Sequence, residues 1–116
     1  MKKTKMLKKN YEFRIVLKNG KYFSGEFLEA FIYKNSKTFN LLGLAISTKV
    51  GKAFKRNRIK RLIRENYKII EKDIEIGYSI VFLLKKKNYD MKNVDFYNVQ
   101  KDIELIFKKS KLIESK

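Results

Sequence analysis

The sequence contains no cysteine, no histidine and no proline. Without cysteine the chain cannot form disulfides or thiolate metal sites, and without histidine it has no imidazole base or ligand. The usual zinc sites and the Ser-His and Cys-His catalytic pairs are therefore excluded. Any chemistry would need carboxylates or lysines, or would have to come from a partner. The absence of proline removes the strongest helix breaker.

Negative charge and long apolar runs are also scarce. The 116 residues include 29 Lys+Arg but only 12 Asp+Glu, a formal net charge of +17. That excess is far beyond what solubility needs, and it indicates a polyanionic partner. No apolar run approaches the roughly 20 residues of a membrane-spanning helix, and the N-terminus lacks the apolar block of a signal peptide. We therefore expect a cytoplasmic protein that binds nucleic acid, with residues 1–116 folding as one domain.

Arginine is rare and is concentrated in one stretch. Four of the five arginines, Arg56, Arg58, Arg61 and Arg64, fall within nine residues of the segment 51–67. The planar guanidinium grips phosphate in two places, whereas lysine is a flexible point charge. A chain that uses lysine elsewhere and groups its arginines here uses this segment for geometry as well as for charge.

The same stretch predicts an amphipathic helix, because no glycine interrupts residues 52–76. Apolar residues recur at three- and four-residue spacing and form one stripe, which comprises Ile59, Leu62, Ile63, Asn66 or Tyr67, and Ile70. The opposite side is strongly cationic. An ordinary solvated surface helix is the alternative, but only Glu65 and Glu71 offset the charge, and like charges at this spacing repel one another.

The rest of the chain indicates a mixed α and β protein. The expected order is a loose basic start (1–5), a helix (6–18), a short strand (21–23), strands (26–33 and 39–48), the Arg-rich helix, a buried strand (78–84), a closing helix (94–112) and a frayed tail from 113. We expect the strands 26–33 and 39–48 to form a hairpin, and the strand 78–84 could pair parallel to an earlier strand. This order predicts an α+β sandwich with the helices on one mostly apolar sheet face.

Alternation along the two predicted strands 26–33 and 39–48 gives one apolar sheet face, made by Leu28, Ala30, Ile32, Leu42, Leu44 and Ile46. The other sheet face offers a possible binding surface. It would place Phe31 and Tyr33, with Glu29, beside the small residues Ala45 and Ser47 of the neighbouring strand. Such a surface suits a shallow groove in which bases stack or an extended strand lies. Alternatively, the first helix covers this face and the aromatic residues are ordinary core. The lysines at 85–87 are either a solvated strand end or another phosphate contact.

The run Arg56-Asn57-Arg58-Ile59-Lys60-Arg61-Leu62-Ile63-Arg64 closely resembles the signature helix of the bacterial ribonuclease P protein subunits. Residues 43–47 and 49–53 resemble the strand and link that precede this helix in that family, and residues 7–13 and 106–110 resemble its opening and closing helices. The resemblance implies a two-layer αβββαβα sandwich. It also implies a left-handed crossover around the Arg-rich helix, an exception to the right-handed rule that these residues alone do not predict.

The resemblance further implies a function. Proteins of this family bind a large catalytic RNA, and the complex removes the 5′ leader of precursor tRNA, with the RNA performing the hydrolysis with magnesium ions. The protein strengthens substrate and metal binding and is not catalytic alone. An RNA-binding surface is then expected at Lys49, Lys52, Lys55, Arg56, Asn57, Arg58, Lys60, Arg61, Arg64 and Lys68.

Two further sites follow from the resemblance. Asn57 would orient a phosphate or a hydrated Mg²⁺. A cleft between the first helix and the sheet would hold the leader, with Phe13, Leu17, Phe31, Ala45 and Ser47 as its residues. Leu17 stands where a second cleft aromatic is expected. Glu29, if it faces the cleft, would repel a leader phosphate or hold a cation.

Other functions stay open on the residues alone. A DNA-binding regulator would need a helix and tight turn before the Arg-rich helix, but a strand is predicted there. A general RNA chaperone or ribosome-associated protein would show no preference for precursor over mature tRNA in the presence of the catalytic RNA. A stand-alone nuclease would need clustered carboxylates, but the candidates are scattered: Glu26, Glu29, Asp73, Asp90 and Asp95.

Overall fold

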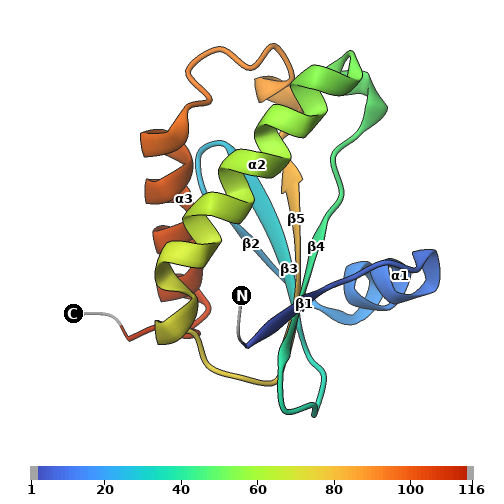
Figure 1. Ribbon diagram of the computed structural model, residues 1–116, viewed down its shortest axis with the longest axis vertical. Helices are drawn as coiled ribbons and strands as arrows, with labels where there is room; N and C mark the ends of the chain where they lie inside the picture. The colour runs from blue at the N-terminus through green and yellow to red at the C-terminus, as the bar shows by residue number, and fades with distance from the viewer. Residues whose placement is uncertain (1–2, 115–116) are drawn as a thin grey trace.

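The computed structural model describes residues 3–114, which form one mixed five-stranded sheet with three helices (Figure 1). The strands are β1 (Thr4–Met6), β2 (Lys21–Ser24), β3 (Leu28–Lys34), β4 (Asn40–Leu44) and β5 (Tyr78–Leu84). The helices are α1 (Asn10–Asn19), α2 (Ala53–Ile70) and α3 (Phe96–Lys109). Single 3-10 turns lie at Thr48–Val50, Glu71–Asp73 and Lys86–Asn88. The predicted α+β order is confirmed, with one additional strand at the start.

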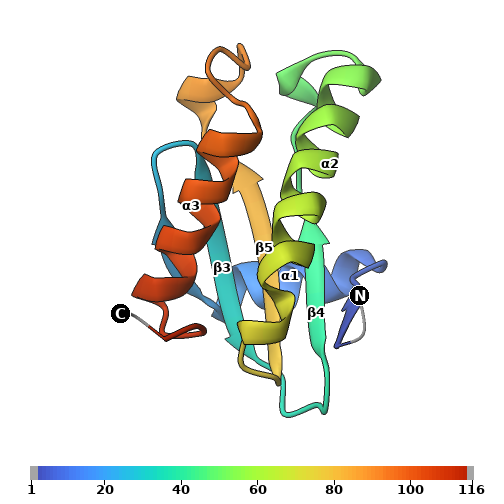
Figure 2. The same ribbon diagram turned by 60° about the vertical axis from the view of Figure 1, so that its left-hand side comes forward.

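The sheet carries helices on both faces. In Figure 2, α2 and α3 lie side by side in front of the sheet and α1 lies behind it. The main core fills the space under α2 and α3, where Ile63, Tyr67, Phe82 and Phe107 are fully buried. A second, smaller cluster of Leu7, Val16 and Val81 lies under α1. The expectation that all helices share one face is therefore wrong for α1, because its apolar side needs the second face of the sheet.

The predicted alternation of the strands is confirmed. In β3, Leu28, Ala30 and Ile32 enter the main core, whereas Phe31 packs against the cluster under α1. In β4, Leu42 faces the main core in the same way. The side chains of a strand point to opposite faces in turn, so each strand contributes to both cores.

The predicted hairpin between the strands 26–33 and 39–48 is wrong. The sheet order is β1-β4-β5-β3-β2, so β5 lies between β3 and β4. β5 pairs antiparallel with β3 and parallel with β4, where Leu42 stands opposite Ile80. The reason is burial: Ile80, Val81 and Phe82 are all fully buried, and a strand that is apolar on both faces stabilises the sheet most from its centre. The parallel pairing considered for residues 78–84 is confirmed.

The N-terminal residues are more ordered than expected. Thr4–Met6 form β1, which pairs parallel with β4, and α1 begins only at Asn10. The hydroxyls of Thr4 and Tyr67 are hydrogen-bonded at 2.8 Å, which ties β1 to α2. Three residues are too few to show a strand pattern, so only the neighbouring β4 defines this strand. At the other end, Ile113 packs against the core; residues 1–2 and 115–116 of the expected loose ends lie outside the described residues.

The connection from β4 through α2 to β5 is left-handed. Both strands point the same way in Figure 2, α2 runs back in front of them, and β5 lies to the left of β4. The implied exception to the right-handed rule is therefore present in this chain. Within residues 3–114, none of the helices combines the length and the apolar character that a membrane crossing requires.

Candidate nucleic-acid interface

α2 separates an apolar side from a cationic side, as its sequence predicts. Ile59, Leu62, Ile63, Asn66 and Tyr67 are buried against the sheet and α3. Of the predicted RNA-binding residues, Lys49, Lys52, Lys55, Asn57, Arg58, Arg61 and Lys68 are exposed, and Arg56, Lys60 and Arg64 are half-buried. The first turn of α2 has no acidic residue, so cations and the positive end of the helix dipole act together. This surface attracts phosphate.

The turn that leads into α2 is fixed by local hydrogen bonds. Ser47 Oγ accepts from the Lys49 amide at 3.1 Å, and Gly51 adopts a φ of +133° that other residues rarely adopt. Arg56 donates from its guanidinium to the Gly51 carbonyl at 2.5 Å. One arginine of the cluster therefore holds the turn in place.

Phe54 was missed by the sequence analysis. Its side chain is 66% exposed in the first turn of α2, the most open position of any large hydrophobic residue among the described ones. At 100° per residue it shares a side with Arg58 and Arg61. The sequence does contain a signal for Phe54, because it is an apolar residue that lies outside the apolar stripe of a cationic helix.

A hollow of about 420 Å³ lies between α1 and the C-terminal ends of β4 and β5. We call it the cleft; its lining residues are Asn10, Phe13, Leu17, Leu44, Ala45, Ile46, Ser47, Leu83, Leu84 and Tyr89. It brings together four of the five predicted cleft residues. The fifth, Phe31, lies outside the lining and packs beside Tyr22, with ring centroids 5.3 Å apart. α1 therefore covers part of this face and leaves the cleft open.

Two side chains change the expected character of the cleft. Tyr89, from the segment after β5, adds a second aromatic ring to the lining that contains Phe13 and Leu17. It was not predicted because it lies in an expected loop, which has no periodic pattern. Glu29 is not part of the lining. Its carboxylate accepts a hydrogen bond from the Tyr22 hydroxyl, and this bond raises the pKa of Tyr22.

The cleft and the cationic surface adjoin. Ser47 lines the cleft and also caps the turn that presents Lys49 and leads into α2. A single strand leaving the cleft at Ser47 would meet the lysines and arginines of α2 directly.

Comparison with known proteins identifies the family. A family model described as Ribonuclease P matches residues 1–111. The chain belongs to the ribonuclease P protein family. It is 39% identical over 109 residues to the ribonuclease P protein component of Clostridioides difficile, covering 93% of both chains. It is 42% identical over 99 residues to that of Clostridium kluyveri, covering 84% of this chain and 88% of the other.

Solved structures of the ribonuclease P family share the fold. The RNase P protein from Thermotoga maritima superposes with a TM-score of 0.81 at 29% identity, covering 90% of this chain and 96% of that one. This chain therefore shares its mixed sheet and three helices with the solved ribonuclease P proteins.

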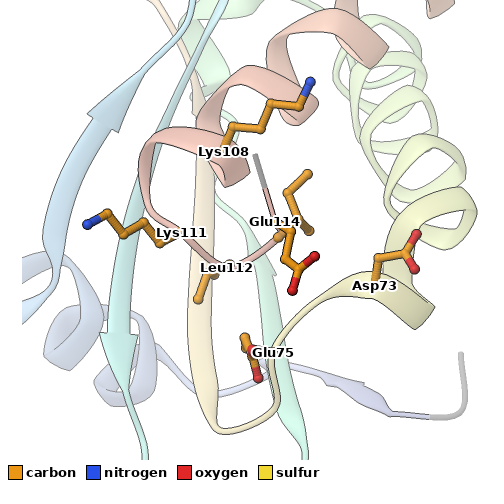
Figure 3. A pocket seen from close by; sticks show the side chains of 7 residues that line it. Asp73, Glu75, Lys108, Lys111, Leu112 and Glu114 are labelled. Carbon is orange, nitrogen blue, oxygen red and sulfur yellow. The ribbon is translucent and has the colours of Figure 1, made fainter. Parts of the chain in front are cut away.

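Another hollow of this ribonuclease P family member has a mixed charge character, with three carboxylates and two lysines, Lys108 and Lys111, in its lining. About 750 Å³ in volume, it lies where α2 and α3 end, and Figure 3 shows Asp73, Glu75 and Glu114 around it, with Lys111 turned away. With three carboxylates against two lysines, this hollow attracts a polyanion less than the cationic side of α2 does. Within residues 3–114, no group of three Asp or Glu side chains is arranged to hold a metal ion.

Proposed function

We propose that this chain is the protein subunit of a ribonuclease P ribonucleoprotein. In that complex it binds the catalytic RNA and the 5′ leader of precursor tRNA, and it aids the magnesium-dependent removal of the leader. The observation that carries the proposal is an open, partly aromatic cleft that adjoins the cationic side of α2 in a chain of this family. Hydrolysis belongs to the RNA, so the chain is an enzyme only as a subunit, and it works in the cytoplasm.

The cationic side of α2 binds the catalytic RNA. Its lysines and arginines neutralise phosphates and release condensed counterions. Arg58 and Arg61 are exposed and can grip phosphates in two places. Phe54, on the same side, offers a ring on which an unpaired base stacks. The lysines at 49, 52 and 55 extend this surface toward the cleft.

The cleft binds the leader as a single strand. Phe13 and Tyr89 provide ring faces for bases, and Leu17 provides apolar contact where a third ring is absent. Ala45 and Ser47 are small and leave room for the sugar-phosphate backbone. Such contacts tolerate many sequences, which suits leaders that differ from one precursor to the next.

We expect magnesium to be bound by the RNA and the protein together, not by protein side chains alone. Asn57 is exposed in the second turn of α2 and offers one neutral amide oxygen. Magnesium keeps several waters and is commonly bound beside substrate phosphates. Asn57 would therefore contact a hydrated ion that RNA phosphates hold, and the nearby lysines and arginines would lower the repulsion between the two RNAs.

The decisive test is leader cleavage of a precursor tRNA by a bacterial ribonuclease P RNA at low magnesium, with and without this protein. We expect cleavage to occur only when the protein is present. Tight RNA binding without any cleavage would refute the proposal and favour the alternative, a general RNA chaperone or ribosome-associated protein. That alternative also predicts equal affinity for precursor and mature tRNA in the presence of the catalytic RNA.

A further inference from the structure

α1 divides the second face of the sheet into two parts. On one side of α1 lies the cleft. On the other side lie two adjoining hollows of about 540 and 300 Å³, which share Glu12, Lys37 and Leu41 in their linings. We call these two hollows together the lysine groove. Three lysines and three aromatic residues give the groove its character: Lys5, Lys8, Lys37, Tyr11, Tyr33 and Phe39.

The first hollow gathers three ammonium groups. Lys5 Nζ lies 4.5 Å and Lys37 Nζ 5.8 Å from the ring centroid of Phe39, and Lys8 lines the same hollow. Glu12 is the only carboxylate in the lining, and it is engaged at the start of α1, where it accepts from the Lys9 amide at 3.1 Å. The ring attracts both ammonium groups, and a bound anion would relieve their mutual repulsion. The geometry suits a phosphate.

The second hollow offers aromatic and apolar surface. Tyr11 is 52% exposed, Tyr33 is half-buried, and Ile15 and Leu41 complete an apolar floor. Lysines beside exposed rings are the combination that binds single-stranded nucleic acid, since the rings stack on unpaired bases while the lysines follow the backbone. A duplex keeps its bases stacked within itself and would leave these rings unused.

The position of the lysine groove identifies which single strand it binds. Lys8 of the groove and Asn10 of the cleft are two residues apart, at most about 7 Å along the chain. β4 likewise joins the two sites: from Leu41 in the groove to Ala45 at the cleft is four residues, about 13 Å of extended chain. A strand in the cleft can therefore continue past the start of α1 into the lysine groove.

We propose that the lysine groove binds the distal 5′ part of the precursor leader, beyond the part that lies in the cleft. The other end of the cleft, at Ser47, adjoins the RNA-binding side of α2, so the scissile end of the leader lies there and the distal end leaves past α1. The inference rests on the proposed function. It extends leader recognition to a second surface, so affinity depends on leader length.

The experiment compares two charge-matched variants of the protein in the complex with catalytic RNA. The groove variant carries Lys5→Gln, Lys8→Gln and Lys37→Gln. The control carries Lys92→Gln, Lys101→Gln and Lys108→Gln, which removes the same charge at three other exposed lysines. Lys101 is a close match because its Nζ lies 4.5 Å from the centroid of the Tyr97 ring. Affinity is measured for precursors whose leaders are shortened one nucleotide at a time.

For long leaders we expect the groove variant to bind about tenfold more weakly than the control. Its slope of log affinity against log salt should fall by about 2, because each lost single-strand phosphate contact removes about 0.7. For leaders that fill only the cleft, the two variants should bind alike. Tyr11→Ala should weaken only long leaders as well, and Tyr11→Phe should restore them, since the ring is what stacks.

Two results would overturn the assignment. Equal weakening at every leader length would mean that the groove contacts the catalytic RNA, and no weakening at any length would mean that it binds no RNA. Cleavage of precursors with short leaders tests the proposed function independently of the lysine groove. If wild-type protein fails to support this cleavage, the proposed function itself is wrong and the inference falls with it.

Discussion

At the residue scale, the arginines of α2 differ in what their side chains contact. Arg58 and Arg61 project from α2 into solvent, while Arg56 donates to the Gly51 carbonyl and stabilises the preceding turn. The sequence predicted this cluster because four of five arginines fall together. It could not predict that Arg56 has a local partner, because that contact depends on the conformation of the turn.

We expect Arg58→Ala and Arg61→Ala each to weaken binding to the catalytic RNA by about 1–3 kcal/mol and to reduce the salt slope by about one. Each change removes one phosphate contact and leaves the buried side of α2 intact. Filter binding across a salt series measures both quantities. Arg14→Ala, at the only arginine outside the cluster, is the control and should change neither. Wild-type affinity and slope in both α2 variants would disprove the role of this surface.

Phe54→Ala should also weaken binding to the catalytic RNA by about 1–3 kcal/mol, but without changing the salt slope. The reason is that a stacked ring contributes no charge, so no counterions are released. Phe54→Tyr should retain most of the affinity. Tyr97→Ala removes another exposed ring, on α3, and should have no effect. A changed salt slope in Phe54→Ala would show that the substitution disturbs the neighbouring cations instead.

At the scale of elements, one buried carboxylate attaches α3 to the sheet. Asp102 is 4% exposed and accepts the backbone N–H groups of Glu26, Phe27 and Leu28 at 2.8, 2.7 and 2.7 Å. Gly25 leaves the space, since a Cβ there would lie 2.5 Å from the Asp102 carboxyl carbon. The turn before β3 therefore depends on a residue some 75 positions away in the sequence, which no local pattern reveals.

Asp102→Ala should lower the free energy of unfolding by about 3 kcal/mol, because three backbone donors, two of them in buried hydrogen bonds, lose a carboxylate acceptor. Urea denaturation followed by circular dichroism measures the loss. Lys101→Ala changes the adjacent exposed position and should stay within about 0.5 kcal/mol of wild type. A loss below about 1 kcal/mol in Asp102→Ala would mean that water replaces the carboxylate.

The contact between α2 and β1 predicts a dependence on high pH. Burial raises the pKa of Tyr67 to about 12 from its ordinary value of 10.0, and the Thr4 hydroxyl is its partner. Below pH 10 the phenol is protonated in both states and its stabilisation is complete. Between pH 10 and 12 the unfolded chain loses this proton while the folded chain keeps it, so stability falls by about 2–3 kcal/mol.

Tyr67→Phe removes that contribution. At neutral pH the variant should be about 1 kcal/mol less stable, because Thr4 loses its partner. From pH 10 to 12 the difference should shrink and then change sign, because wild type loses about 2–3 kcal/mol over this range and phenylalanine has no proton to lose. Urea denaturation across this range measures it, and Tyr97→Phe, at an exposed position, should parallel wild type. A constant difference between Tyr67→Phe and wild type would contradict the linkage.

Local sequence patterns predicted where the helices and strands lie far better than which strands pair. The alternation in β3 and β4 and the apolar stripe of α2 follow from residue spacing, and all three are confirmed. The hairpin failed because strand pairing depends on where β5 inserts, which is decided by burial on both of its faces. The left-handed crossover came from family resemblance alone. In the cleft, Leu17 was predicted but Tyr89 was not, since a loop carries no periodicity.

At the scale of the whole molecule, charge is distributed unevenly along α2. The lysines and arginines concentrate at its start, whereas the hollow beyond its end is lined by three carboxylates and two lysines. A helix of 18 residues is about 27 Å long, well beyond the Debye length of about 8 Å in physiological salt. The two ends therefore present separate fields to an approaching RNA. This asymmetry orients the protein with the start of α2 and the cleft toward the polyanion.

That orientation predicts how the protein helps the complex. A net charge of +17 placed between two RNAs reduces their repulsion and favours bound magnesium. The protein itself supplies no group at the reacting phosphate, so the chemical step should change little. We therefore expect the protein to lower the magnesium concentration for half-maximal cleavage and to tighten precursor binding, while the saturating single-turnover rate changes by less than about tenfold. Magnesium titrations of single-turnover cleavage, with precursor affinity measured in calcium, separate these effects. A protein that changed only the saturating rate would have to act on the chemistry directly, and the electrostatic account would then be wrong.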